Sequence, residues 1–234
     1  MAAQRHVELL SMLDAESDDP AALLRRVCEL CVDVCAVSGA AIVVHTDGAG
    51  DGTAQAVACA TDPVSLIIDD LQRTVGEGPR VAAYTLGGPV LVADLATAGT
   101  RWPAFTSAAQ AAGVAAVFSF PLHVGAVRVG TLDLYRGREG SLSRAELRDA
   151  LALADIATHT VLDDLSGPDP MDVGWLSDVH AVVHQATGVV TVQLNVSMHD
   201  ALLRIRAHAY AHQTPLDEVS RQIVGRYLYL ETGD

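Results

Sequence analysis

The sequence predicts an α+β domain, with helices on the faces of an antiparallel sheet, followed by an all-α module of three helices. Two stretches at 40–46 and 55–60, the first rich in β-branched residues, flank an Asp-Gly turn, which is the pattern of a β-hairpin. Further strands are expected at 114–122, which is a continuous apolar run, and at 127–135, which follows it after a short turn. Beyond residue 175 the apolar residues recur at helical spacing.

The first domain is expected to span residues 1–166. Apolar residues at helical spacing predict its longer helices, at 2–15, 20–37, 63–75 and 143–165. The second of these helices places Cys28, Cys31 and Cys35 on its apolar face. We expect these cysteines and Cys59 to be reduced, and the helical three to pack as small hydrophobic side chains.

Residues 167–234 are expected to form the second domain, after a linker that contains Gly and Pro. Its first helix carries an apolar stripe made by Leu176, Val179, Val183, Ala186 and Val190. Ser197 and Asp200 have capping-box spacing at the start of a second helix, and Thr214 and Asp217 repeat this pattern at a third. The apolar face of the third helix is predicted to hold Leu216, Val219, Ile223, Tyr227 and Leu230.

The charge balance excludes a general nucleic-acid-binding surface. Among 234 residues there are 15 basic and 29 acidic side chains, which give a formal net charge of −14. The sequence contains no lysine, and neither domain has an excess of arginine over acidic residues. Any contact with nucleic acid would therefore be local, made by a few arginines and weakened by salt.

No targeting, catalytic or metal-binding pattern is apparent. The N-terminus lacks an apolar segment of signal-peptide length, and the longest uncharged run, 102–127, is interrupted by prolines and polar residues. These features predict a cytoplasmic protein without membrane contact. Gly76-Glu77-Gly78-Pro79 lacks the following Lys-Ser/Thr of a phosphate-binding loop and predicts a tight turn. The pairs His180–His184 and His208–His212 lie beside or outside the apolar faces, so we expect solvated side chains, no metal and no cofactor.

Several motifs in the second domain follow one another in one register without a gap. They are Gln185-Ala186-Thr187-Gly188-Val189-Val190, Leu194-Asn195-Val196-Ser197, Ile205-Arg206-Ala207-His208-Ala209 and Pro215-Leu216-Asp217-Glu218-Val219. They resemble the ANTAR family, whose members are three-helix RNA-binding modules of transcription antiterminators. The chain departs from this family at Thr187, where a Lys is usual, and at Gln213-Thr214, where a basic residue is often found.

A second set of motifs runs through the first domain. It includes Gly76-Glu77-Gly78-Pro79, Arg101-Trp102-Pro103, Phe118-Ser119-Phe120-Pro121-Leu122 and Gly130-Thr131-Leu132-Asp133-Leu134-Tyr135. These motifs are similar to those of GAF sensor domains that precede ANTAR modules in actinobacterial proteins. Such relatives often have a Cys where this chain has Arg80, so a cysteine at that place cannot be its sensor. A pocket for an unknown small-molecule signal is expected among Trp102, Phe118, Phe120 and Tyr135.

The two resemblances imply a signal-responsive, non-enzymatic regulator of transcription antitermination. It would bind, as a homodimer, an RNA element with two hairpins in a nascent transcript. The residues expected to contact RNA are Gln185, Thr187, Arg204, Arg206 and Arg221. Arginine suits this task because its planar guanidinium pairs with phosphate and stacks on unpaired bases.

Two alternatives remain open at this stage. Thr187 and the acidic charge favour a GAF sensor and dimerisation protein whose degenerate ANTAR module acts through protein partners rather than RNA. A redox enzyme built on the first domain is the other alternative, and it would need reactive thiols.

Overall fold

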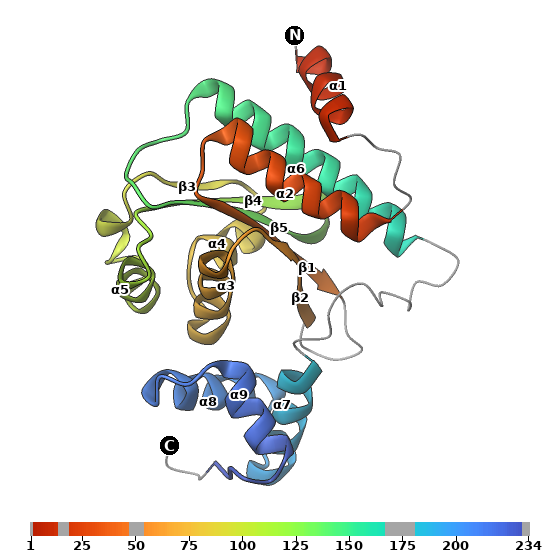
Figure 1. Ribbon diagram of the computed structural model, residues 1–234. Helices are drawn as coiled ribbons and strands as arrows, with labels where there is room; N and C mark the ends of the chain where they lie inside the picture. The colour runs from red at the N-terminus through yellow and green to blue at the C-terminus, as the bar shows by residue number, and fades with distance from the viewer. Residues whose placement is uncertain (1, 14–18, 47–53, 167–180, 231–234) are drawn as a thin grey trace.

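A larger α+β domain and a smaller helical domain make up the structure, a computed structural model that describes residues 2–13, 19–46, 54–166 and 181–230 (Figure 1). The sheet of the larger domain has five antiparallel strands in the order β2-β1-β5-β4-β3. These are β1 (Gly39–Thr46), β2 (Ala54–Ala60), β3 (Val90–Val92), β4 (Ala116–Val124) and β5 (Val127–Arg136). The α+β fold class is therefore confirmed, together with the hairpin of β1 and β2.

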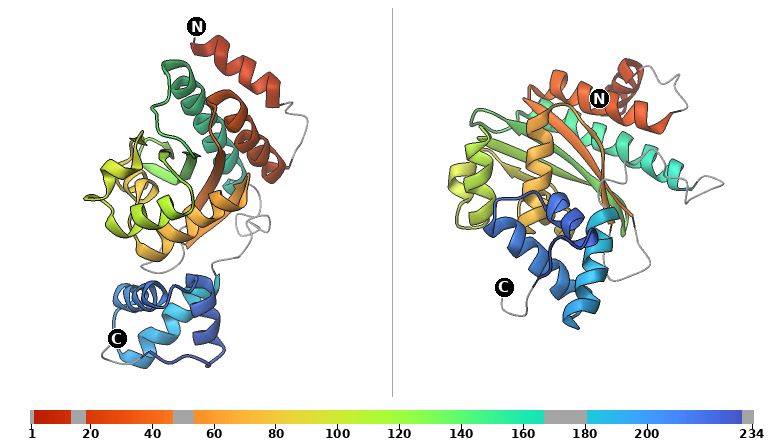
Figure 2. Two further views of the ribbon diagram at one scale, coloured as in Figure 1. Left: turned by 60° about the vertical axis from the view of Figure 1, so that its left-hand side comes forward. Right: turned by 60° about the horizontal axis from the view of Figure 1, so that its bottom comes forward.

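Helices cover both faces of this sheet (Figures 1 and 2). One face is covered by α2 (Pro20–Cys35) and α6 (Arg144–Leu165), with α1 (Ala2–Leu13) packed outside them. The other face is covered by α3 (Pro63–Val75), α4 (Pro79–Leu86), the short 3₁₀ helix η1 (Leu95–Ala98) and α5 (Pro103–Ala111). Two separate apolar cores result, one on each face of the sheet. None of the helices within the described ranges is long and apolar enough to cross a membrane.

Local hydrogen bonds fix where the covering helices begin. The carboxylate of Asp62 accepts the N–H groups of Val64 and Ser65 at 2.8 and 3.0 Å, which caps α3. The same carboxylate accepts the hydroxyl of Tyr135 at 3.0 Å and so ties α3 to β5. At α6, Ser143 and Glu146 form a reciprocal capping box.

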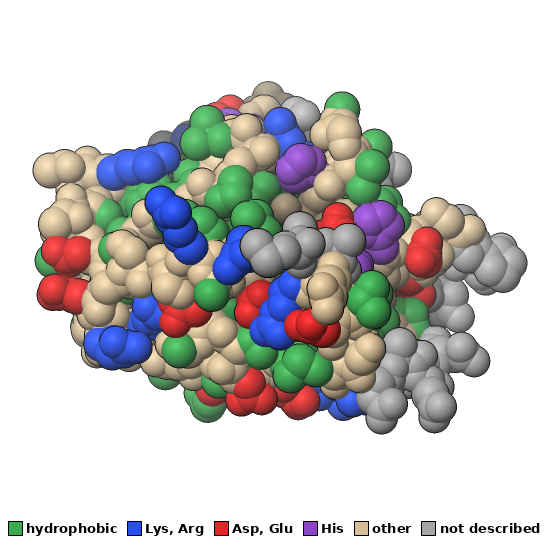
Figure 3. Space-filling model, turned by 90° about the horizontal axis from the view of Figure 1, so that it is seen from above, with side chains coloured by type: hydrophobic (Ala, Val, Ile, Leu, Met, Phe, Trp, Pro, Cys, Tyr) green, Lys and Arg blue, Asp and Glu red, His purple; other side chains and the backbone are tan. Residues whose placement is uncertain are grey.

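The outer surface of α1 and α6 keeps several apolar side chains exposed. Val7 is 60% exposed, Met12 53% and Leu151 44%. Figure 3 views this end of the molecule and shows hydrophobic side chains lying among arginines and acidic residues. Arg5 of α1 pairs with Asp149 of α6, with 2.8 Å between Nη2 and Oδ2, and so fixes α1 on the domain.

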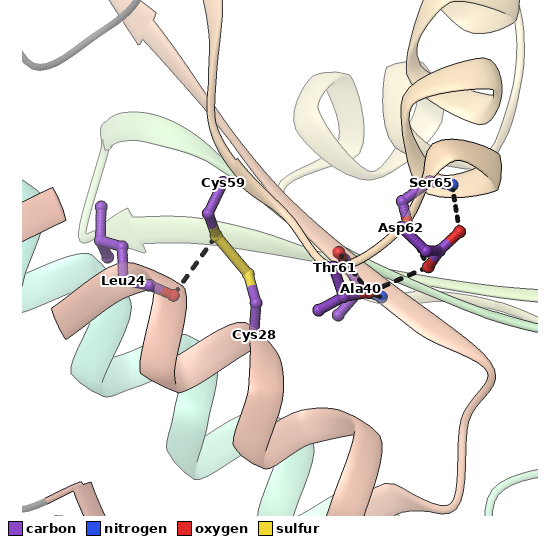
Figure 4. The surroundings of a disulfide bond; sticks show 7 residues. All are labelled: Leu24, Cys28, Ala40, Cys59, Thr61, Asp62 and Ser65. Atoms are coloured by element: carbon purple, nitrogen blue, oxygen red, sulfur yellow. Dashed lines mark hydrogen bonds between the residues drawn. A yellow bond between two sulfur atoms is a disulfide. The ribbon is translucent and has the colours of Figure 1, made fainter. Parts of the chain in front are cut away.

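A disulfide between Cys28 and Cys59 joins α2 to β2, so the expectation of four reduced cysteines is wrong for this pair (Figure 4). The sulfur of Cys59 also lies 3.3 Å from the carbonyl oxygen of Leu24. Cys31 and Cys35 are free and buried in the apolar core. Burial raises the pKa of the Cys31 thiol, which agrees with a packing role for this residue.

The smaller domain consists of α7 (Ala181–Leu194), α8 (Met198–Ala211) and α9 (Leu216–Val224) around one apolar core. The predicted apolar stripe of the first helix is confirmed for Val183, Ala186 and Val190, which are buried. Leu176, Val179, His180 and the boundary between residues 166 and 167 lie outside the described residues. Ser197 caps α8 as expected, because its Oγ accepts the N–H of Asp200 at 3.1 Å.

The third helix differs from the prediction at both ends. At its start Thr214 donates to the carbonyl of His212 at 3.2 Å, and α9 has no side-chain cap, so no capping box forms with Asp217. At its end the helix stops at Val224, and Tyr227 is 88% exposed instead of facing the core. Leu230 is only 2% exposed and reaches the core from a non-helical segment.

Thiol labelling tests the disulfide. Protein unfolded without reductant is expected to react at the two free cysteines, Cys31 and Cys35, and at all four of its cysteines after reduction. Cys59→Ser removes a crosslink between residues 31 positions apart and is expected to lower the free energy of unfolding by roughly 3–4 kcal/mol. Four reactive thiols before reduction would contradict the disulfide.

Candidate sensor pocket and nucleic-acid interface

A group of buried polar side chains lies on the sheet face that α3 and α4 cover. His45, Thr131 and Asp133 project from β1 and β5, and Ser119 projects from β4, each 7% exposed or less. Their neighbours along these strands are mostly apolar. Buried polar groups that interrupt an apolar core are costly, so they mark a candidate ligand site.

Arg80, in the first turn of α4, places its guanidinium among these groups. The residue is 2% exposed, and its Nη1 lies 3.0 Å from Oδ1 of Asp69. The same nitrogen donates to Oε1 of Gln55 at 3.1 Å, and Nη2 donates to the carbonyl of Asp69 at 3.3 Å. A buried cation needs such partners. The chain therefore supplies its own cation to this pocket.

The pocket also contains hydrogen-bonding capacity that is not used by the described residues. The atoms concerned include both ring nitrogens of His45, Nε2 of Gln72 and Nε of Arg80. Each unsatisfied group costs about 1–3 kcal/mol. The free space beside Asp133 and Tyr135 is only about 10 Å³, which suffices for about one water molecule. A larger polar solute would enter only after the residues that line this space move apart.

Burial shifts two acid–base groups of this pocket in opposite directions. It raises the pKa of Asp133 to about 6, against the opposing effects of Arg80, of the Ser119 side chain and of the Thr131 hydroxyl, which donates at 3.0 Å. Burial, and then the charge of Arg80, lower the pKa of His45 to about 3. The neutral His45 ring stacks on Tyr84, with 3.7 Å between centroids. At neutral pH the site thus contains a neutral imidazole and a carboxylate that is mostly ionised.

The four aromatic residues expected to line one pocket lie on two sides of the sheet. Trp102 and Tyr135 belong to the core under α3 and α5. Phe118 and Phe120 belong to the core under α2 and α6. They are two positions apart in β4 and therefore point to the same face of the sheet. A single pocket made of all four is therefore ruled out, and only Tyr135 lies beside the polar group described above.

The residues expected to contact RNA are also divided. Gln185 is exposed on α7, and the Arg221 side chain is 61% exposed on α9, where it pairs with Glu218 at 3.0 Å. Arg204 is partly exposed on α8. Thr187 is instead 4% exposed, and its hydroxyl donates to the carbonyl of Val183 at 2.7 Å. Thr187 therefore belongs to the core of the module and not to its surface.

Arg206 points toward the larger domain rather than toward solvent. It is largely buried, and burial, followed by the charges of Arg73 and Arg80, lowers its pKa. Gly76 ends α3 in the left-handed region at φ 71°, and a Cβ built on it would lie 3.0 Å from Nη1 of Arg206. The guanidinium thus sits at the C-terminal end of α3, where the helix dipole favours a cation.

A second contact joins the same end of α3 to α9. Arg73, whose side chain is 8% exposed, donates to both carboxylate oxygens of Asp217 at 2.6 and 3.2 Å. It also pairs with Asp70 at 2.6 Å and lies 3.9 Å from Asp69. Asp217 is in the first turn of α9, where a negative charge is favoured. We call the four residues Arg73, Gly76, Arg206 and Asp217 the seam.

Comparison with known families now places both domains. The family model described as "GAF domain" matches residues 17–163, which is more than half of the chain. The chain belongs to the GAF domain family. Residues 178–224 match the model described as "ANTAR domain", so this GAF protein carries an ANTAR domain after its sensor fold. A search among curated proteins finds no match.

Solved structures with the same fold have little sequence identity to this GAF–ANTAR protein. The GAF domain of the Acinetobacter phosphoenolpyruvate-protein phosphotransferase is 12% identical with a TM-score of 0.51, and the match covers 70% of this chain and 94% of that one. Escherichia coli SdiA is 13% identical with a TM-score of 0.54, and the match covers 97% of this chain and 99% of the other. At such identity these similarities concern the fold alone.

Sequence reasoning missed the charged residues that matter most here. Asp133 and Thr131 could have been found, because they stand in alternate positions of an apolar strand and so share one buried face. The pairing of Arg73 with Asp217 could not be predicted from local sequence patterns, since 144 positions separate the two residues.

Replacing Asp133 tests its buried charge. Since burial raises its pKa from 3.8 to about 6, the folded state holds this proton more tightly than the unfolded state. The stabilisation is complete below about pH 4 and is lost as the pH rises through about 6. Between these limits the free energy of unfolding is expected to fall by up to roughly 3 kcal/mol relative to Asp133→Asn.

Urea unfolding across this pH range measures the difference, with the exposed Asp163→Asn as the control. Parallel curves for wild type and Asp133→Asn would show that the carboxylate is not buried in the folded protein.

Proposed function

We propose that this GAF–ANTAR protein is a cytoplasmic, signal-controlled antitermination regulator that binds hairpin RNA through its ANTAR helices. Sensor and RNA-binding domains on one chain support a regulator of this kind in general. The observation that carries the proposal is the seam, in which the sensor helix α3 holds both α8 and α9. A signal received by the GAF domain thus has a direct physical contact through which to act on the RNA-binding helices.

The seam would keep RNA binding low while the two domains are docked. Arg206 is one of the few cations of the ANTAR domain, and in the docked arrangement its guanidinium is covered by α3. Arg221 and Gln185 stay exposed, so docking leaves part of the RNA surface available. Undocking adds Arg206 to this surface. RNA and the GAF domain then compete for the same side chain.

A homodimer fits this proposal, because paired ANTAR domains could engage the two hairpins of one RNA element. The outer face of α1 and α6 is the candidate contact surface, since it combines exposed Val7 and Leu151 with charges of both signs. A self-complementary surface of that composition suits a two-fold symmetric contact.

RNA binding itself is tested first, with a two-hairpin RNA and a scrambled single hairpin of equal length across a salt series. Arg221→Ala is expected to weaken binding to the two-hairpin RNA and to lower the log–log salt slope by about 1. Arg138→Ala, an equal loss of charge at an exposed position of the GAF domain, is the control. Equal, weak binding to both RNAs would favour the alternative of a degenerate ANTAR module that acts through protein partners.

The seam is tested with Asp217→Asn, and the exposed Asp163→Asn of α6 is the control. Asp217→Asn removes the carboxylate of the ANTAR domain that pairs with Arg73, whereas Asp163→Asn removes an equal charge outside the seam. We expect Asp217→Asn to bind RNA on the order of tenfold more tightly than Asp163→Asn, because it releases Arg206. Hydrogen exchange at the end of α3 should rise in the same variant alone. Equal affinity and equal exchange in the two variants would contradict control through the seam.

A further inference from the structure

The segment after α9 is held in place against the ANTAR core. Gly225 ends the helix, and Arg226 turns the chain with φ at 61°. The N–H groups of Tyr227 and Leu228 then both donate to the carbonyl of Gln222, at 2.8 and 3.1 Å. At its far end Leu230 is buried, and its carbonyl accepts Nε2 of Gln193 on α7 at 3.0 Å. The segment 225–230 is therefore fixed at both ends.

Two tyrosines project from this fixed segment into solvent. Tyr227 is 88% exposed and Tyr229 61% exposed, while Leu228 and Leu230 pack on the core. Exposed and buried residues alternate from 227 to 230, so both rings face solvent. Tyrosine has a large apolar surface that is normally buried or used in contacts. Two such rings held on the surface of a small domain indicate a binding surface.

The charges beside these rings indicate what they bind. Arg221 and Arg226 are both exposed close by in the sequence, in a chain whose formal net charge is −14. Arginines for phosphates together with aromatic faces for bases are the combination that proteins use for unpaired nucleotides. The ANTAR family match ends at residue 224, so it does not extend to this segment.

We propose that Tyr227 and Tyr229 form a stacking surface for unpaired bases, such as hairpin-loop bases, of the RNA. This inference rests on the proposed function and adds to it the part of the RNA that is read. The rings would stack on bases while Arg221 and Arg226 contact the adjoining phosphates.

The test uses the full chain and the two-hairpin RNA, with loop bases replaced in turn by fluorescent 2-aminopurine. Tyr227→Leu and Tyr229→Leu are each expected to weaken binding about tenfold and to relieve the quenching of a stacked loop base. Their salt slopes should match wild type, because stacking releases no counterions. Tyr227→Phe and Tyr229→Phe retain the aromatic face and should bind as wild type does. Thermal unfolding of all variants should be unchanged, since these side chains are exposed.

The outcomes separate this inference from the function on which it rests. Selective RNA binding that neither Leu variant weakens would overturn the stacking surface and leave the proposed function standing. Failure of the unaltered protein to bind RNA would overturn both. Loss of binding in the Phe variants would assign the contact to the hydroxyl groups and not to the rings. Leu variants that lose self-association in sedimentation but keep RNA affinity would assign the tyrosines to a second copy of the chain.

Discussion

Pairing of the buried Arg73 guanidinium is the constraint on which the arrangement of the two domains depends. Its side chain is 8% exposed, and leaving such a cation without carboxylates would cost several kcal/mol. Asp69 and Asp70 come from its own helix, whereas Asp217 comes from the ANTAR domain. In the proposed function, undocking would remove Asp217 but would also return Arg73 to water. These two effects would oppose each other, so that the docked and undocked states differ little in free energy, as a switch requires.

Asp69 connects this contact to the interior of the sensor. One of its oxygens lies 3.0 Å from Nη1 of Arg80 and the other 3.9 Å from Nε of Arg73. Nε of Arg73 has no hydrogen-bond partner among the described residues, and neither has Nε of Arg80. A solute that draws Arg80 away would free Asp69 to move toward Arg73, in competition with Asp217. Asp69 thus lies between the pocket and the seam, and under the proposed function it would couple the two.

Three similar sequence patterns show how far local reasoning reaches. Ser197 caps α8 as its spacing with Asp200 predicts. Ser143 and Glu146 have the same spacing and form a reciprocal capping box, although Glu146 also pairs with Arg136 at 3.1 Å. Thr214 with Asp217 has the same spacing, yet Asp217 pairs with Arg73 from the other domain. The sheet, the helices that cover it and most helix bounds were predictable, because they follow from residue patterns that are local in the sequence. The seam was not, because a charge far away in sequence outweighs a local hydrogen bond.

The low content of basic residues makes the seam more effective. Coulombic affinity for RNA grows with the number of phosphates that cations contact, and salt weakens each contact. A strongly basic domain would lose little if one arginine were covered. The ANTAR domain has few arginines in a chain with 29 acidic residues, so under the proposed function covering Arg206 would remove a substantial share of its cationic contacts with RNA. Under the proposed function, the acidic composition and the arginine held by α3 would act together, and a modest change in docking would become a large relative change in RNA affinity.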